Sequence, residues 1–171
     1  ASAEFYSEYH GHRIDDLAVA HSTLQENGAQ SYVFLAGDSS MGNKHWLFDK
    51  FEAKERQLRK ISRANSGFVS DAINGYESVL EPPLMVKDVS YWLNQEASER
   101  LGPGQVVTLM SAVEESTIQD RLDSSSGLLA QDAFIRDTIS EDDYLILSVG
   151  GNDVALRPTV MTALFMKLLV M

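Results

Sequence analysis

Three short apolar runs without polar alternation constrain the fold of this chain most strongly. They are Tyr32–Ala36, Val106–Met110 and Tyr144–Val149. A run of this kind suits a parallel β-strand that is covered on both faces. Segments with helical spacing separate the runs, and alternation of strands and helices is typical of a parallel sheet between two helical layers. We therefore expect an α/β fold, a three-layer α/β/α sandwich with a central parallel sheet, in a single domain over residues 1–171.

The helix predictions rest on apolar residues at helical spacing and on glycine or proline stops. Thr117–Leu122 is expected to be a short helix, and residues 62–83 are expected to be mainly loop. The longer helices are expected over residues 13–25, 46–61, 84–100 and 131–139, and in the tail from Thr159. Asn27-Gly28 is expected to end the first helix. Pro82-Pro83 is expected to open the helix over 84–100, and Gly102-Pro103-Gly104 to close it.

Charge and cysteine content exclude several classes of function. The 171 residues carry 14 Lys and Arg against 25 Asp and Glu, a formal net charge of -11. A protein this acidic is poorly suited to nucleic acid or to an anionic membrane surface, since both need clustered basic residues. The absence of cysteine excludes disulfides, thiol nucleophiles and thiolate metal sites. No apolar run reaches about 18 residues, so we predict no membrane span.

Polar residues collect where two of the predicted strands end. Gly37-Asp38-Ser39 follows the first strand, and Gly150-Gly151-Asn152-Asp153 follows the third. In open parallel sheets, functional groups lie beyond the carboxyl ends of the strands. Taken singly, each motif has a structural explanation, a helix N-cap at Asp38 and Ser39 and a tight turn at the second motif.

Taken together, the two motifs resemble those of the SGNH hydrolases, also called the GDSL family of esterases and lipases. The matching segments read VFLAGDSSMGN over residues 33–43 and YLILSVGGNDVALRPT over residues 144–159. The resemblance implies a flavodoxin-like sandwich and a serine ester hydrolase acting on a small-molecule ester without a cofactor. It implies Ser39 as nucleophile and Asn152 as oxyanion donor. The supporting motif residues are Gly37, Asp38, Gly151 and Asp153.

The family also has a middle block, in which a backbone N–H contributes to the oxyanion hole. The best match here is VVTLMSAVEESTIQDRL over 106–122, with Ala112 at the position of the family's glycine. Gly75 is a weaker candidate for the same role. If the first alignment holds, residues 44–83 are largely an insertion after the nucleophile block.

The family's last block, Asp-x-x-His near the C-terminus, has no match in this chain. Its histidine is the general base that accepts the serine proton. No histidine follows His45, and His10, His12 and His21 are not near any predicted strand end. We expect His45 to be a structural histidine and we predict no metal site. The chain therefore resembles a hydrolase domain that is truncated before its last strand, helix and base.

The missing base keeps a second function open, a non-catalytic binding module with the same fold and pocket. A third interpretation is a flavodoxin-like phosphate-binding domain with the 37–40 turn as an anion cradle. It leaves the Gly-Gly-Asn-Asp motif without a role.

The tail from Val160 to Met171 is apolar all round and carries one charge, Lys167. Such a helix is expected to be buried, and an exposed apolar patch usually marks an interface. We therefore predict a homo-oligomer that forms through this helix.

Overall fold

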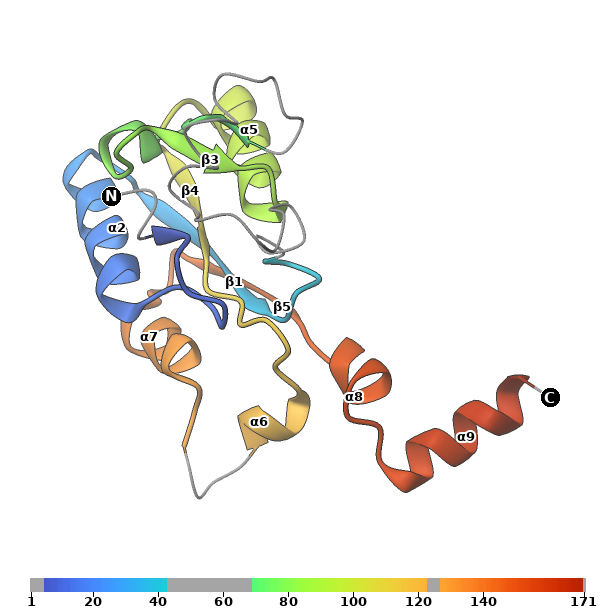
Figure 1. Ribbon diagram of the computed structural model, residues 1–171. Helices are drawn as coiled ribbons and strands as arrows, with labels where there is room; N and C mark the ends of the chain where they lie inside the picture. The colour runs from blue at the N-terminus through green and yellow to red at the C-terminus, as the bar shows by residue number, and fades with distance from the viewer. Residues whose placement is uncertain (1–4, 43–68, 123–126, 171) are drawn as a thin grey trace.

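A three-stranded parallel sheet organises the protein (Figure 1). The computed structural model describes residues 5–42, 69–122 and 127–170. The strand order is β4-β1-β5, with Leu35 of β1 opposite Met110 on one side and Ile146 on the other. All three predicted strands are confirmed. They are β1 (Ser31–Gly37), β4 (Val106–Met110) and β5 (Tyr144–Ser148).

Helices flank both faces of this sheet. Tyr32, Phe34 and Ala36 of β1 point to the face packed against α2 and α7, while Val33 and Leu35 point to the α5 side. This alternation buries β1 on both faces, as its unbroken apolar run predicts. The three helices are α2 (Ile14–Glu26), α7 (Ala130–Thr138) and α5 (Val89–Leu101).

Helix boundaries follow the sequence signals closely at α2 and less closely at α5. The predicted stop of α2 at Asn27-Gly28 is confirmed, with Gly28 at a φ of 100°. The predicted helix over 84–100 begins too early. Residues Leu84–Val86 form strand β3, and Asp88 then caps α5 by accepting the Tyr91 N–H at 3.0 Å. An aspartate N-cap outweighs the proline signal here.

The segment predicted to be mainly loop contains two short elements. Strand β2 (Val69–Asp71) pairs antiparallel with β3, and a 3-10 turn covers Tyr76–Ser78. The helix predicted over residues 46–61 and the histidine at position 45 lie outside the described residues. The predicted short helix after Thr117 is confirmed as α6 (Ile118–Leu122).

The outer edge of β4 is closed by side chains. Asn94 of α5 accepts the Thr108 N–H at 2.9 Å and donates to the Thr108 carbonyl at 3.0 Å. Tyr76 also donates to that carbonyl, and Asn74 donates to the Val106 carbonyl. Side-chain amides and a phenol thus take the place of a neighbouring strand.

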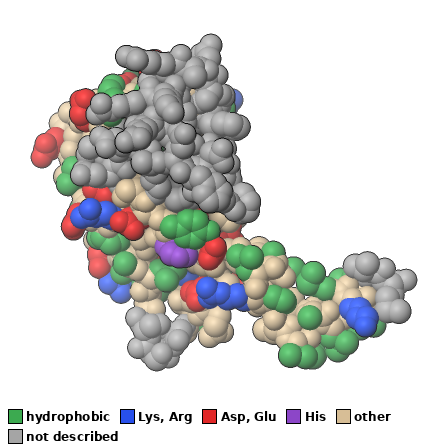
Figure 2. Space-filling model, in the orientation of Figure 1, with side chains coloured by type: hydrophobic (Ala, Val, Ile, Leu, Met, Phe, Trp, Pro, Cys, Tyr) green, Lys and Arg blue, Asp and Glu red, His purple; other side chains and the backbone are tan. Residues whose placement is uncertain are grey.

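The opposite edge of the sheet, at β5, is open. Side chains Tyr144–Leu147 of β5 are each at least 40% exposed, so the expectation that this apolar run is covered on both faces is wrong. Helix α8 (Gly151–Ala155) follows β5, and beyond it helix α9 (Val160–Val170) projects from the body of the molecule (Figure 1). Green apolar side chains lie exposed along this projecting arm (Figure 2). The helix predicted in the tail is confirmed as α9, but it is not buried within its own domain.

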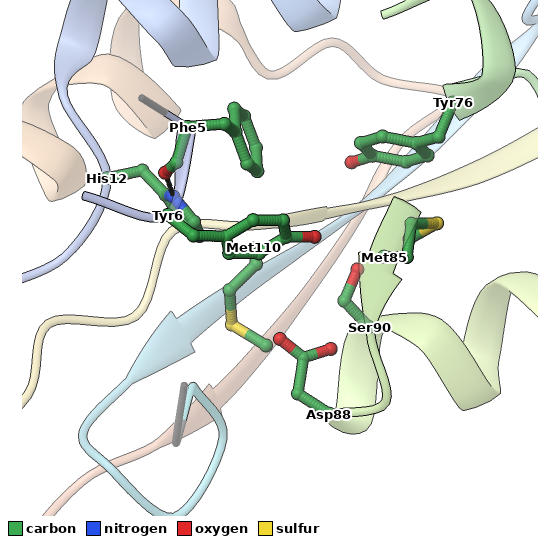
Figure 3. A pocket seen from close by; sticks show the side chains of 8 residues that line it. All are labelled: Phe5, Tyr6, His12, Tyr76, Met85, Asp88, Ser90 and Met110. Carbon is green, nitrogen blue, oxygen red and sulfur yellow. Dashed lines mark hydrogen bonds between the residues drawn. The ribbon is translucent and has the colours of Figure 1, made fainter. Parts of the chain in front are cut away.

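A small internal cavity lies between the N-terminal segment, β4 and the start of α5 (Figure 3). Tyr6, Asp88 and Ser90 direct oxygen atoms toward it, and Met110 forms part of its wall. Its volume of about 10 Å³ holds one water molecule at most. Burial and the nearby Asp88 carboxylate raise the pKa of Tyr6, so its phenol stays protonated. We regard this cavity as part of the core.

None of the described helices combines the length and apolar character that crossing a bilayer requires.

Candidate functional site

The two motifs selected from the sequence lie side by side at the edge of the sheet where the carboxyl ends of the strands β1 and β5 meet. The Asp38 N–H donates to the Ser148 carbonyl at 3.2 Å, which joins the end of β1 to the end of β5. The hydroxyl oxygens of Ser40 and Ser148 lie 3.3 Å apart. The parallel register therefore brings the Gly-Asp-Ser segment beside the segment that leads into Asn152.

Asp38 holds the turn that presents Ser39. Its buried carboxylate accepts the Ser40 N–H at 2.9 Å, and its carbonyl accepts the Met41 N–H at 3.0 Å. An aspartate that binds a backbone N–H two residues on is a common way to close a turn. Ser39 is half-buried at the apex, and its hydroxyl has no hydrogen-bond partner within the described segments.

Gly37 is required by the close approach of β1 and β5. A Cβ at this position would overlap the Ser148 carbonyl oxygen, which belongs to the backbone and cannot turn aside. A Cβ at Gly42 would instead meet the flexible Met110 side chain at 3.2 Å. The glycine before Asp38 therefore has a structural explanation that does not depend on catalysis.

We predict that Gly37→Ala lowers the free energy of unfolding by about 2 kcal/mol, because the two strand ends must move apart. Urea denaturation measures this loss. Gly42→Ala is the matched control and is expected to cost under about 1 kcal/mol, since Met110 can shift its side chain. Equal losses in the two variants would contradict the prediction.

Asn152 lies in the first turn of α8 and is 7% exposed. Its side-chain amide donates to the Ser116 carbonyl at 3.0 Å. Its backbone carbonyl accepts the N–H groups of Leu156 and Arg157. One amide hydrogen therefore orders the loop after β4, and a primary amide has a second hydrogen for another acceptor.

The neighbours of Asn152 tie α8 to the same loop. Asp153 accepts the Ile118 N–H at 2.9 Å. A Cβ on Gly151 would lie 3.5 Å from the Asp38 carboxylate, so Gly151 and Asp38 are close across the edge. Gly150 has a φ of 112°, a backbone conformation that favours glycine.

The two candidates for a backbone oxyanion donor lie at different places. Ala112 is buried just beyond β4, in a cluster with Leu35, Met41 and Met110, and therefore beneath the turn that carries Ser39. Gly75 lies next to Asn74, which bonds the carbonyl at the start of β4. Gly75 is therefore at the amino end of the strands, and its N–H donates to Glu77. Of the two, only Ala112 shares the edge with Ser39.

Arg121 connects the end of β1 to the helices. Its guanidinium donates to the Gly37 carbonyl at 2.9 Å and to the Ser116 hydroxyl at 2.8 Å, and it pairs with Asp132 at 3.1 Å. Burial raises the pKa of Asp132, and the Arg121 charge partly offsets that rise. Sequence reasoning missed this residue, because a lone arginine in a short helix resembles any solvated one.

The expectation that His10 lies away from the strand ends is wrong. Its Nδ1 is 3.1 Å from the Glu114 carbonyl, in the loop that follows β4. The next residue back, Val113, donates its N–H to the Gly37 carbonyl at 2.9 Å. Tyr9 reaches the same loop by donating to Glu115. An N-terminal segment without a periodic pattern gives no sign of this placement.

Asp120 forms an ion pair with Arg157 beside this edge. The Thr117 N–H and hydroxyl lower the pKa of Asp120, with a further contribution from Arg157. The described parts of the chain contain no group of three or more His, Asp or Glu side chains placed to hold a metal ion.

No family model, curated protein or solved structure matches this chain.

Proposed function

We propose that this protein is a serine ester hydrolase of the SGNH type, or a portion of one, with Ser39 as nucleophile and Asn152 as oxyanion donor. The observation that carries the proposal is the 3.2 Å hydrogen bond from the Asp38 N–H to the Ser148 carbonyl, which holds the two motifs at one sheet edge. The strand order β4-β1-β5 supports the finer fold assignment. It agrees with the first three strands of a flavodoxin-like sheet, in which the first strand lies between the second and third.

In this proposal, the Ser39 hydroxyl attacks the ester carbonyl while its proton passes to a base. The base returns this proton to the departing alcohol, and water then hydrolyses the acyl-serine to the free acid and the serine hydroxyl. The negative oxygen of each tetrahedral intermediate would accept hydrogen bonds from the Ser39 N–H, the Ala112 N–H and the second amide hydrogen of Asn152.

His10 is the candidate for the base. A carbonyl can only accept, so the contact with the Glu114 carbonyl has Nδ1 as the donor. This tautomer leaves Nε2 with a lone pair, the arrangement a general base needs.

One observation favours the second candidate function, a binding module without catalysis. The Ser39 hydroxyl has no imidazole partner within the described residues. A serine without a base is a weak nucleophile, although the same edge could still bind an ester or a related small molecule.

Labelling with a fluorophosphonate probe separates the two functions, because only an activated serine reacts quickly. We expect Ser39 to be labelled, Ser39→Ala to lose the label, and Ser40→Ala, its exposed neighbour, to retain it within about twofold. Hydrolysis of short p-nitrophenyl esters should follow the same order. His10→Gln should slow both reactions by about 100-fold. Labelling of the unaltered protein no faster than that of Ser39→Ala would exclude the hydrolase and leave the binding module.

A further inference from the structure

The face of β5 that adjoins α7 is an open apolar groove. Its volume is about 250 Å³. Leu145 and Leu147 of β5 line one side, and Ile135 of α7 and Ile139, which follows α7, line the other. Asn94 and its neighbours close the opposite edge of the sheet at β4. The apolar side chains that line the groove at β5 have no comparable cover within the described residues.

Helix α9 has the complementary character. Its apolar side chains are exposed on every side, with Val160 87% and Leu169 86% exposed at its two ends. It holds 11 residues and is therefore about 16 Å long. The five residues of β5 span about the same distance. The helix and the strand that borders the groove match in length.

The single charge of α9 favours one direction of this helix in the groove. Lys167, in its last turn, is the only charged residue of the helix. The residues that precede β5 are Glu141, Asp142 and Asp143, at the amino end of the strand. An α9 that lies antiparallel to β5 places Lys167 at this acidic turn. The opposite orientation would leave the lysine near the other end of the groove.

The connection to α9 favours a helix from another molecule. Asn152, Asp153 and Arg157 all bond the α6 segment or the loop before it, the last through an ion pair with Asp120 at 3.1 Å. Only Pro158 and Thr159 separate Arg157 from the helix, and the φ of proline is fixed. The chain therefore directs α9 away from its own α7 and β5, as Figure 1 shows.

We propose that α9 of a second copy of this chain occupies the groove between α7 and β5, antiparallel to β5, with Lys167 at the 141–143 turn. The exchange is reciprocal, so each copy donates one helix and receives one. Two identical contacts related by a two-fold axis close the assembly as a dimer. This inference does not depend on the esterase proposal.

Cysteine cross-linking tests the occupant directly, because the sequence contains no cysteine. Leu145→Cys places a thiol in the groove, and Leu164→Cys places one on α9. Mixing the two single variants under mild oxidation should give a disulfide-linked dimer. Leu101→Cys, on the exposed end of α5, is the matched control for Leu145→Cys and should not link to Leu164→Cys.

A charge exchange tests the orientation. Sedimentation should show a dimer at micromolar concentration, and Lys167→Glu should weaken it about tenfold or more. Adding Asp142→Lys to that variant should restore it. A monomer at tens of micromolar would overturn the proposal. So would a Leu145→Cys/Leu164→Cys double variant that links only within one chain, because its own α9 would then fill the groove.

Discussion

Asn94→Leu is expected to lower the free energy of unfolding by about 3 kcal/mol, although it replaces one side chain by another of similar size. Asn94 is completely buried, and its amide satisfies both the N–H and the carbonyl of Thr108. The side-chain oxygen of Asn94 accepts from the Thr108 N–H at 2.9 Å and from the Asn74 amide at 2.8 Å. Leucine cannot accept, so both donors lose a buried acceptor. Each unsatisfied buried group costs about 1–3 kcal/mol. The Thr108 carbonyl keeps its bonds from Tyr76 and Ser90.

Urea denaturation of both proteins measures the difference. Gln95→Leu is the matched control, since Gln95 is the next residue of α5 and bonds the exposed Glu99. We expect it to change stability by less than about 0.5 kcal/mol. Amide hydrogen exchange at Thr108 should also accelerate in Asn94→Leu alone. If that variant remained within 1 kcal/mol of the unaltered protein, the amide would not be needed to close the β4 edge.

The sheet could be predicted from sequence because its signal is local and strong. Mainly apolar runs identified β1, β4 and β5, and the Asn27-Gly28 stop identified the end of α2. The start of α5 could not be identified in the same way. Pro82-Pro83 and Asp88 are both plausible helix starts, and the choice depends on the pairing of Leu84–Val86 with β2. That pairing is a tertiary contact.

Burial of β5 was mispredicted because an apolar run shows what a strand can bury, and not what covers it. β1 and β5 have similar apolar patterns. Among the described elements, β1 has a paired strand on each side and helices on both faces, whereas β5 pairs with β1 alone. Both β5 and α9 expose apolar surface that needs a partner surface to bury it. The sequence indicated this need for α9 alone.

The candidate site was predictable where it consists of strand ends. Ser39 and Asn152 each follow a strand directly, so the parallel topology brings their motifs to the same edge. Arg121 and His10 reach that edge from a short helix and from the N-terminal segment. Their positions depend on how the chain folds back over the sheet, which residue spacing does not encode.

Arg121→Met is expected to cost about 3 kcal/mol or more in the free energy of unfolding. The side chains of Arg121 and Asp132 are only 11% and 12% exposed. Removing one member of a buried ion pair leaves the other charge uncompensated, which typically costs 3–5 kcal/mol. The Gly37 carbonyl and the Ser116 hydroxyl also lose a donor. Because Gly37 leads into the turn, labelling of Ser39 should fall as well.

The double variant Arg121→Met/Asp132→Leu identifies the cause, because it removes both charges. It should recover most of the lost stability, since an apolar pair of similar volume often replaces a buried ion pair without loss.

The pH dependence of Arg121→Met provides a second test. Without Arg121, burial raises the pKa of Asp132 further, so the folded state binds the proton more tightly than the unfolded state. When folding raises the pKa of a carboxyl group, the protein becomes more stable as the pH falls through that raised pKa. The stability deficit of the single variant should therefore shrink below neutral pH, while the double variant should show no such change. A deficit that stays constant with pH would mean that the lost Gly37 and Ser116 hydrogen bonds, rather than the uncompensated carboxylate, cause the destabilisation.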